Sequence, residues 1–343
     1  MVTQKDVANL AGVSFITVSR VINGERNVKE ETRRKVQSAI DKLGYSPSFA
    51  GQVLNSGRCN TIAILTPIPF RQSMRTFYLM EILAGIEEIC NRNKIDMMIG
   101  IVPEAENNSN FDYLRPYKQK KVDGIIYVGL KKLPNEMISE LDKRKLPCVV
   151  IGDRPKNKLM SWVDTDNFEA GYNSVQQLWN HGHRQIAFIG INKDIYNENI
   201  TDREKGFIKA LNDLGAKYNP EDYIIRTELP SPTIDAEVQN AFSKWKKKPT
   251  AIFCGTDWLV PGTIQGIKKY GLSVPDDISI IGFDGFINLT YFYMNIATFP
   301  QPLREMGQRA AEILLNHIKN PEQKKETAVF KVPFQDGDSL RKI

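Results

Sequence analysis

The stretch that decides this fold is Thr3–Asn23, which reads TQKDVANLAGVSFITVSRVIN. Thr3 and Asp6 have the spacing of a capping box, which predicts that a first helix begins here. Gly12 supplies the backbone freedom that a sharp turn needs, and Ser14 can cap a second helix. The stretch therefore predicts two short helices joined by a tight turn.

The second of these helices has an outward face that suits DNA. The apolar residues of the pair fall on the inward faces, at Val7, Ala8, Ala11, Val13, Val18 and Val21. The outward positions are Phe15, Ile16, Thr17, Ser19 and Arg20. Apolar, hydroxyl and guanidinium groups together suit base edges and phosphates in a major groove. The alternative is an ordinary helical hairpin inside a larger core.

Charge is concentrated next to this stretch. The first 60 residues contain nine Lys or Arg and five Asp or Glu, a net charge of +4. The other 283 residues carry only the remaining +2 of the chain's net charge of +6. Phosphate binding requires such a local excess of positive charge. A length of 343 residues predicts two or three domains.

Composition also limits the compartment and the cofactors. Cys59, Cys90, Cys148 and Cys254 are far apart, so we expect neither a disulfide framework nor a zinc site. The N-terminus is polar and no apolar run approaches the length of a membrane span. We therefore expect a cytoplasmic protein that has no cofactor and no membrane partner.

A third helix and a linker follow the first two helices. The helix is predicted from about Glu30 to Leu43, and Tyr45 just beyond it either donates its hydroxyl to a phosphate or packs. Residues 48–57, SFAGQVLNSG, are too short and too polar for a core element. Without a partner we expect a flexible linker. On DNA it would become a hinge helix whose Leu54 wedges into the minor groove.

From residue 61 the pattern changes to alternating strands and helices. Buried strands are predicted at 61–66, 96–102, 124–129, 147–152, 185–191, 223–227, 250–254, 278–283 and 328–334. Helices are predicted between them, including 78–93 and 302–319. The fold class that follows is an all-α helix-turn-helix domain plus an α/β core of two lobes, each with a doubly wound parallel sheet.

Several segments together resemble the LacI/GalR family of transcriptional repressors. They include DVANLAGVSFITVSRVIN, EETRRKV and LGYSPS at the front, then VDGII, DNFEAG, GHRQIAFIG, TDWLVPG and VPDDISIIGFD. The resemblance implies a DNA-binding domain at 1–46, a hinge at 47–60, an N-terminal lobe at 61–162 plus 295–326, and a C-terminal lobe at 163–294 plus 327–343. It also implies a homodimer on near-palindromic operator DNA.

The resemblance assigns roles to residues at the DNA end. Phe15, Ile16 and Arg20 match base-reading positions, and Leu54 matches an intercalating leucine. Arg20 could pair with a guanine, whereas Phe15 and Ile16 would contact thymine methyls. Further phosphate or base contacts are expected from Ser14, Thr17, Ser19, Asn23 and Tyr45.

Candidate effector residues follow strands or open helices, where ligands bind in such folds. Asp284 can accept hydrogen bonds from two adjacent sugar hydroxyls, and Arg203 can donate to hydroxyls or a carboxylate. The further candidates are Phe77, Tyr78, Asp153, Thr256, Asp257 and Trp258. Asp257 could equally be a helix cap, and Phe77, Tyr78 and Trp258 could be core residues.

These features predict a DNA-binding regulator, a repressor, controlled by a sugar or sugar phosphate. The same family also includes repressors controlled by purines or by a phosphoprotein, and both alternatives stay open. A sugar-binding transport protein fits the core but not the DNA-binding module. An enzyme is disfavoured because the chain has neither a P-loop nor a glycine-rich dinucleotide motif after a strand.

Overall fold

The computed structural model describes most of the chain, in two compact units, Met1–Asn60 and Thr61–Ile343. The residues described are 2–22, 24–25, 27–46, 51, 53, 57–67, 73–102, 112, 114–129, 133, 135–155, 160–192, 198–228, 232–286 and 294–343, with the backbone alone at 73–76 and 136. None of the described helices is both long and apolar enough to cross a membrane.

Three short helices build the first unit: α1 (Gln4–Ala11), α2 (Phe15–Ile22) and α3 (Glu30–Leu43). Thr3 and Asp6 form the predicted capping box, in which each side chain accepts a hydrogen bond from the other's backbone N–H. Gly12 follows α1 with a φ of 65°, which glycine adopts without strain. The predicted helix-turn-helix is therefore confirmed.

The inward faces of these helices form one small apolar core. Its buried members are Val7, Ala8, Val18, Val21, Val36 and Ala39, with Ala11, Val13, Ile40 and Leu43 packed half-buried against them. All six inward positions predicted on the first two helices lie in this core. The outward face of α2 is therefore left to solvent.

Three residues of the linker are described between 47 and 57. Gly51 and Val53 have helical backbone, and the N–H of Gly57 donates to the Val53 carbonyl at 2.9 Å. Leu54 lies outside the described residues.

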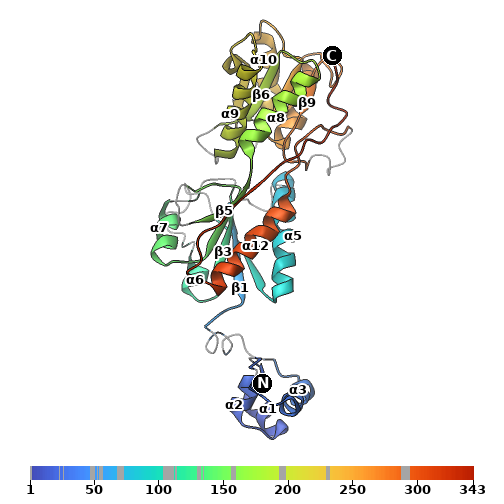
Figure 1. Ribbon diagram of the computed structural model, residues 1–343. Coiled ribbons are helices and arrows are strands. Elements are labelled where there is room, and N and C mark those ends of the chain that lie inside the picture. Colours follow the sequence, from blue (N-terminus) through green and yellow to red (C-terminus); the bar gives the residue numbers. More distant parts are fainter. Residues whose placement is uncertain are drawn as a thin grey trace. The chain divides into compact units, whose positions relative to one another are not determined.

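The second unit begins with a six-stranded parallel sheet (Figure 1) in the order β10-β5-β4-β3-β1-β2. Its strands are β1 (Thr61–Thr66), β2 (Asp96–Ile101), β3 (Gly124–Val128), β4 (Cys148–Ile151), β5 (Ser161–Thr165) and β10 (Thr327–Phe330). Alternate residues of β1 face opposite sides, because Ile62 and Ile64 pack in one core while Ala63 and Leu65 pack in another. The first of these cores lies under α5 (Ser73–Asn93) and α12 (Leu303–Lys319), and the second lies under α7 (Asn135–Lys143) near the short α6 (Arg115–Lys118).

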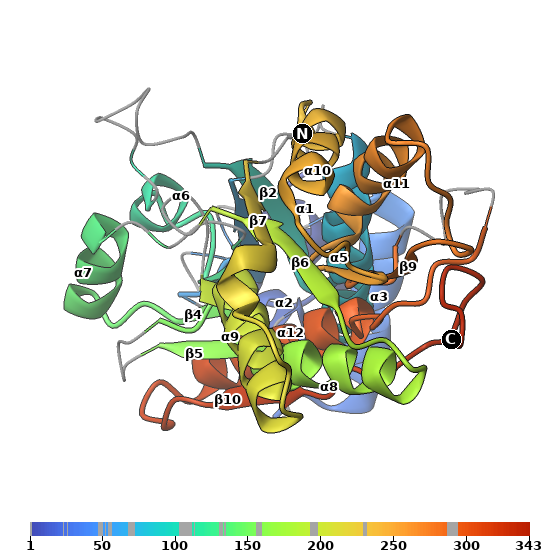
Figure 2. The same ribbon diagram turned by 90° about the horizontal axis from the view of Figure 1, so that it is seen from above.

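A second parallel sheet has four strands in the order β7-β6-β8-β9 (Figure 2). The strands are β6 (Ile186–Ile191), β7 (Ile224–Thr227), β8 (Ala251–Cys254) and β9 (Ser279–Ile281). Helices α8 (Asn167–Asn180) and α9 (Glu198–Asp213) cover one face, and α10 (Ile234–Lys244) and α11 (Val260–Lys269) cover the other. Short 3₁₀ turns lie at η2 (Pro220–Tyr223) and η3 (Asp257–Leu259). Two doubly wound sheets confirm the predicted fold class.

Close packing of α8 on α9 needs glycine. A Cβ on Gly171 would overlap the carbonyl oxygen of Arg203, and one on Gly206 would overlap that of Phe168. The two backbones can therefore approach closely, which brings the Arg203 side chain to the first residue of α8, Asn167.

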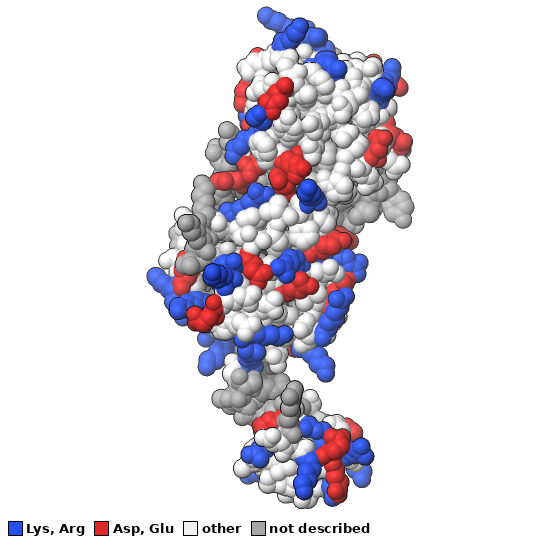
Figure 3. Space-filling view, viewed as in Figure 1, with Lys and Arg blue, Asp and Glu red and all other residues white. Residues whose placement is uncertain are grey.

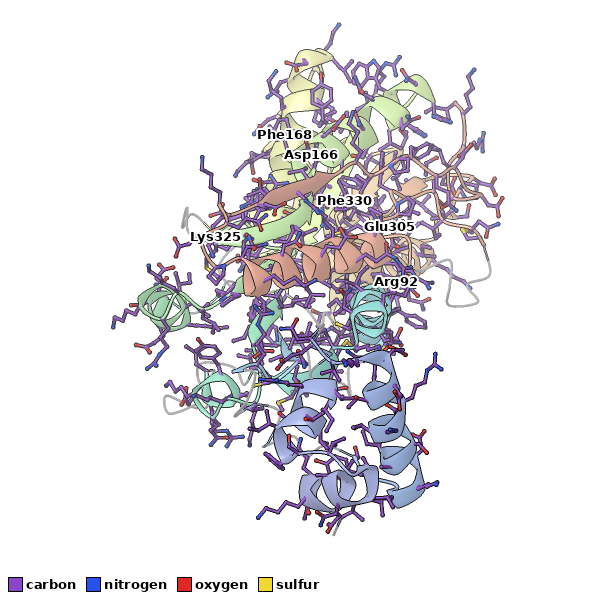
Figure 4. The ribbon with its side chains drawn as sticks, turned by 60° about the horizontal axis from the view of Figure 1, so that its bottom comes forward. Arg92, Asp166, Phe168, Glu305, Lys325 and Phe330 are labelled. Carbon is purple, nitrogen blue, oxygen red and sulfur yellow. The ribbon has the colours of Figure 1, made fainter. Side chains whose placement is uncertain are left out.

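The structure moves several predicted boundaries. β5 was not predicted, and α5 begins five residues before the expected Tyr78. β10 pairs with β5, so Thr327 belongs to the first sheet rather than to the C-terminal lobe. Residues 296–300 lie beside β9, because Ala297 bridges Ile281 and Pro300 bridges Asp284. The three crossings between the sheets therefore follow Thr165, Pro300 and Phe330. Two of them lie side by side, because the Asp166 N–H donates to the Phe330 carbonyl at 3.0 Å (Figure 4).

Candidate nucleic-acid interface and buried polar site

The outward face of α2 presents two large apolar side chains to solvent. Phe15 is 49% exposed and Ile16 is 61% exposed, although both belong to a helix whose other side is buried. Adjacent exposed apolar side chains can mark an interaction site. They occupy the positions predicted to read bases.

Polar residues around α2 are already arranged by contacts within the unit. The Ser14 hydroxyl caps the helix by accepting the Thr17 N–H at 3.2 Å, and the two hydroxyl oxygens are 2.9 Å apart. Arg20 forms an exposed ion pair with Glu25 at 3.6 Å, a contact weak enough to exchange for a base or phosphate. Ser19 is half-buried, and Asn23 lies outside the described residues.

Tyr45 packs half-buried against the core of the first unit, and this burial raises the pKa of its hydroxyl. The packing alternative for Tyr45 is thus observed, whereas a phosphate contact stays a prediction.

In the second unit, buried polar side chains from both sheets meet in one group, which we term the polar cluster. Its members are Asp164, Asn167, Asn199, Arg203, Thr256, Asp284 and Gln301. Arg203 is 4% exposed and lies at its centre. Its Nε donates to the Asn167 side chain at 2.8 Å and its Nη1 donates to the Gly255 carbonyl at 2.5 Å. The guanidinium also lies 3.6 Å from the centre of the Phe283 ring, a cation–π contact.

Asp284 is held in an unusual backbone conformation. Its φ is 114°, which residues other than glycine rarely adopt, and such strain gathers at functional sites. Its carboxylate accepts the Thr256 hydroxyl and the Gln301 amide, each at 2.6 Å. Burial raises the pKa of Asp284, while the Arg203 charge opposes that shift. Arg203 and Asp284 are therefore brought together, as predicted from their positions after strands.

Asp257 has a structural role that differs from the predicted ligand contact. It is fully buried, and its two oxygens accept the Gly285 N–H at 2.8 Å and the Thr298 hydroxyl at 3.2 Å. One carboxylate oxygen thus holds the turn at Gly285, and the other holds Thr298 in the segment beside β9. The reason is that η3 starts at Asp257 directly beneath this turn.

Two members of the cluster join the sheets. Asn199 of α9 donates to the Gly152 carbonyl at 2.9 Å and to Asp164 at 3.1 Å. Gly152 and Asp164 both belong to the first sheet's layer, whereas α9 covers the second sheet. Asp164 also accepts the Arg154 guanidinium at 2.8 Å, and burial raises the pKa of this carboxyl.

The remaining candidate effector residues differ in how deeply they are buried. Tyr78 is 5% exposed, and burial together with the charges of Asp164 and Asp284 raises its pKa, so it keeps its hydroxyl proton. Its neighbour Phe77 is 40% exposed and lies outside the α5 core, a solvent-exposed position. Asp153 is buried next to Asp164 and Glu198, and burial raises its pKa to about 6. Trp258 is half-buried and packs edge-on against Phe286, with ring centres 5.7 Å apart.

Sequence reasoning missed five residues of this site: Arg154, Asp164, Asn167, Asn199 and Gln301. Asn167 is the first residue of α8, and Asp166 before it caps the helix by accepting the Glu169 N–H. The available signal was the run VDTDN, which places polar residues where a buried strand ends. Among the described residues, no group of three or more His, Cys, Asp or Glu is placed to hold a metal ion.

Family models match both ends of the chain. Residues 3–48 match the family model of bacterial regulatory proteins of the lacI family, and residues 175–340 match that of the periplasmic binding protein-like domain. The HTH-type transcriptional repressor PurR of Vibrio campbellii is 34% identical over 349 residues, covering 100% of both chains. The HTH-type transcriptional regulator RegA of Clostridium saccharobutylicum is 34% identical over 319 residues, covering 93% of both.

Solved structures share the fold. The lac repressor dimer bound to operator and the anti-inducer ONPF aligns over 99% of both chains with a TM-score of 0.82 and 21% identity. A LacI family regulator from Enterococcus faecium with bound ribose aligns over 82% of this chain and 99% of its own, with a TM-score of 0.69 and 26% identity. Since a full-length relative is 34% identical, this chain belongs to the LacI family of bacterial transcriptional regulators.

Proposed function

We propose that this regulator binds near-palindromic operator DNA as a homodimer and that a small carbohydrate bound at the polar cluster controls its operator affinity. The observation that carries this proposal is the cluster itself, in which Arg203 and a strained Asp284 lie between two sheets that Asn199 joins. A regulator of this kind acts on DNA in the cytoplasm and returns its effector chemically unchanged.

The DNA-reading residues are proposed on the exposed face of α2. Phe15 and Ile16 would contact thymine methyl groups, and Arg20 would exchange Glu25 for a guanine. Ser14, Thr17, Ser19, Asn23 and Tyr45 are the proposed phosphate or base contacts, and Leu54 is the proposed minor-groove wedge. Two-fold symmetry of the dimer would require two half-sites.

The DNA contacts can be tested by selecting duplexes from a random pool with the full-length chain. We expect a near-palindromic consensus, and Arg20→Gln should lose discrimination at one base pair per half-site by about 1–3 kcal/mol. Phe15→Ala should relax a T·A preference. Leu10→Ala is the matched control, because Leu10 is equally exposed, at 51%, but lies on α1. Selection without any enriched sequence would contradict the proposal.

A carbohydrate fits the donors and acceptors of the polar cluster. A carboxylate accepts two neighbouring hydroxyls, and a guanidinium with five N–H groups donates to ring or hydroxyl oxygens. Tyr78 adds a neutral hydroxyl, and Asp153 adds a second carboxyl. The LacI family regulator from Enterococcus faecium with bound ribose supports this ligand class.

Thermal-shift screening of the full-length chain tests the effector site. Sugars, sugar phosphates and purines are compared, since a ligand that binds the native state raises its stability by about 2.7 kcal/mol at 100 times its Kd. A sugar hit should disappear in Asp284→Asn and Arg203→Lys and persist in the exposed control Asp276→Asn. A purine hit with no sugar hit would replace the carbohydrate proposal, and a hit that survives both cluster variants would move the site elsewhere.

A further inference from the structure

The turns that lead into the first sheet share an unexpected feature. All strands of a parallel sheet begin at the same edge, so these turns lie side by side. The turns before β2, β3 and β4 each hold a lysine with positive φ: 55° at Lys94, 52° at Lys120 and 49° at Lys145. This left-handed conformation is unfavourable for side chains other than glycine or asparagine.

The second sheet uses glycine at the corresponding places. Gly182, Gly215 and Gly271 precede β6, β7 and β9 with φ values of 98°, 73° and 92°. Space does not explain the difference, because a Cβ on Gly215 or Gly271 would meet nothing within 4 Å. The favourable position of a cation near a helix C-terminus does not explain the difference either. Gly215 and Gly271 follow the last residues of α9 and α11 within two positions, just as Lys94 and Lys145 follow those of α5 and α7.

The whole edge is positively charged. The segments 92–95, 118–123, 143–147 and 319–326, which precede β2, β3, β4 and β10, each contain more Lys and Arg than Asp and Glu. The segments before the strands of the second sheet do not share one sign. In Figure 3, Lys and Arg side chains lie over the part of the core where α6 and α7 lie in Figure 1, with Asp and Glu side chains among them.

Several lysines of this edge are exposed to solvent. Lys94, Lys120, Lys121 and Lys145 are exposed, and within the described part of the chain no ion pair engages Lys94 or Lys145. Lys325, which Figure 4 labels beyond α12, lies close enough to Cys148, the first residue of β4, to act on its thiol. Burial raises the pKa of Cys148 to about 12, and the Lys325 charge opposes this shift.

We infer that this lysine edge, made of Lys94, Lys120, Lys121, Lys145, Lys324 and Lys325, binds the phosphate backbone of the DNA duplex on which the first unit reads its operator. This inference rests on the proposed function. Lysines on long stems act as point charges, which suits phosphates without base selectivity.

The position of the edge in the chain favours DNA as the occupant. β1 begins at this edge with Thr61, so residues 47–60 tether the edge covalently to the DNA-binding unit. A tether of 14 residues spans at most about 50 Å even when it is fully extended. DNA held by the first unit is therefore present at high local concentration near the edge.

The test measures how DNA affinity depends on salt, with the full-length chain and a labelled duplex of arbitrary sequence. In the triple variant Lys94→Gln, Lys120→Gln and Lys145→Gln, the slope of log Kobs against log[KCl] should become shallower by about 0.9 for each lost phosphate contact, up to roughly 3 per protomer. The matched control is Lys217→Gln, Lys244→Gln and Lys246→Gln, three exposed lysines of the second sheet's layer that carry the same charge. The control should keep the wild-type slope.

Glycine at the same three positions separates charge from folding. Lys94→Gly, Lys120→Gly and Lys145→Gly fit the left-handed turns, so the melting temperature should hold or rise while the slope falls as it does with glutamine. A wild-type slope in both triple variants, or an equal loss in the control, would overturn the inference and leave the proposed function standing. A wild-type chain that binds no duplex would overturn both.

Discussion

Replacement of Asp257 tests whether this residue holds the Asp284 turn or contacts a ligand. Asp257→Ala removes both acceptors that satisfy the Gly285 N–H and the Thr298 hydroxyl, while Asp257→Asn keeps one acceptor oxygen. Thr298→Val removes only the second contact. Asp257 and Thr298 are fully buried, and Gly285 is half-buried.

The expected loss follows from the two donors left without a partner. A buried donor that loses its acceptor costs about 1–3 kcal/mol. Asp257→Ala should therefore lower the free energy of unfolding by about 2–5 kcal/mol. Asp257→Asn should cost about half as much, because its amide nitrogen faces one of the two donors. Thr298→Val removes one donor from the buried Asp257 carboxylate and should therefore cost about 1–3 kcal/mol.

Urea unfolding followed by tryptophan fluorescence measures these losses. All four tryptophans, Trp162, Trp179, Trp245 and Trp258, lie in the second unit, so the signal reports on the unit that contains Asp257. A loss below about 0.5 kcal/mol in Asp257→Ala, within the range of ordinary surface substitutions, would refute the structural role. In that case the ligand contact expected from the sequence would again be the better interpretation.

Three further predictions concern single residues. Asp153→Asn should stabilise the second unit above pH 6, because the raised folded pKa of about 6 means that ionised Asp153 destabilises the native state. The free energy of unfolding of the wild-type protein should therefore fall by at most about 3 kcal/mol as the pH rises from about 4 to 6, and equal pH profiles of the two proteins in urea melts would contradict this. Gly12→Ala should lower the free energy of unfolding of the first unit by about 1–2 kcal/mol, because φ is 65° there and no steric overlap adds to this backbone cost. Hydrogen exchange of the α1 and α2 amides measures the loss, and unchanged protection would contradict a requirement for glycine at this turn. Gly171→Ala should destabilise the second unit by about 1–3 kcal/mol or more, because the new Cβ overlaps the Arg203 carbonyl, and an unchanged urea midpoint would show that α8 and α9 can separate freely.

The DNA end was predictable because its signals are local. The Thr3–Asp6 capping box and the left-handed Gly12 depend on residues three or four positions apart, and the structure has both as expected. The buried strands were also predictable, since strands covered on both faces read as continuous apolar runs. Strand ends moved by one to four residues where polar turns begin.

The polar site was less predictable because its partners are distant in sequence. Nothing in the run SWVDT indicates a strand, since Asp164 is polar, yet it is fully buried because Arg154, Asn167 and Asn199 satisfy it. Similarly, Asp257 follows a strand as a ligand residue would. Only the fold shows that its two oxygens are taken by residues 28 and 41 positions away.

The hydrogen bonds of Gln301 suggest how a ligand at the cluster could reach the rest of the core. Gln301 donates to Asp284 at 2.6 Å and accepts the Thr165 hydroxyl at 3.2 Å. Thr165 ends β5 just before one crossing between the sheets, and Gln301 itself lies on another, just before α12. A ligand hydroxyl that displaced Gln301 from the Asp284 carboxylate would require the Gln301 amide to find another partner, because buried polar groups stay paired. Such a displacement would change the link between two of the three crossings, and a ligand that favours one arrangement of this link meets the requirement for coupling one site to another.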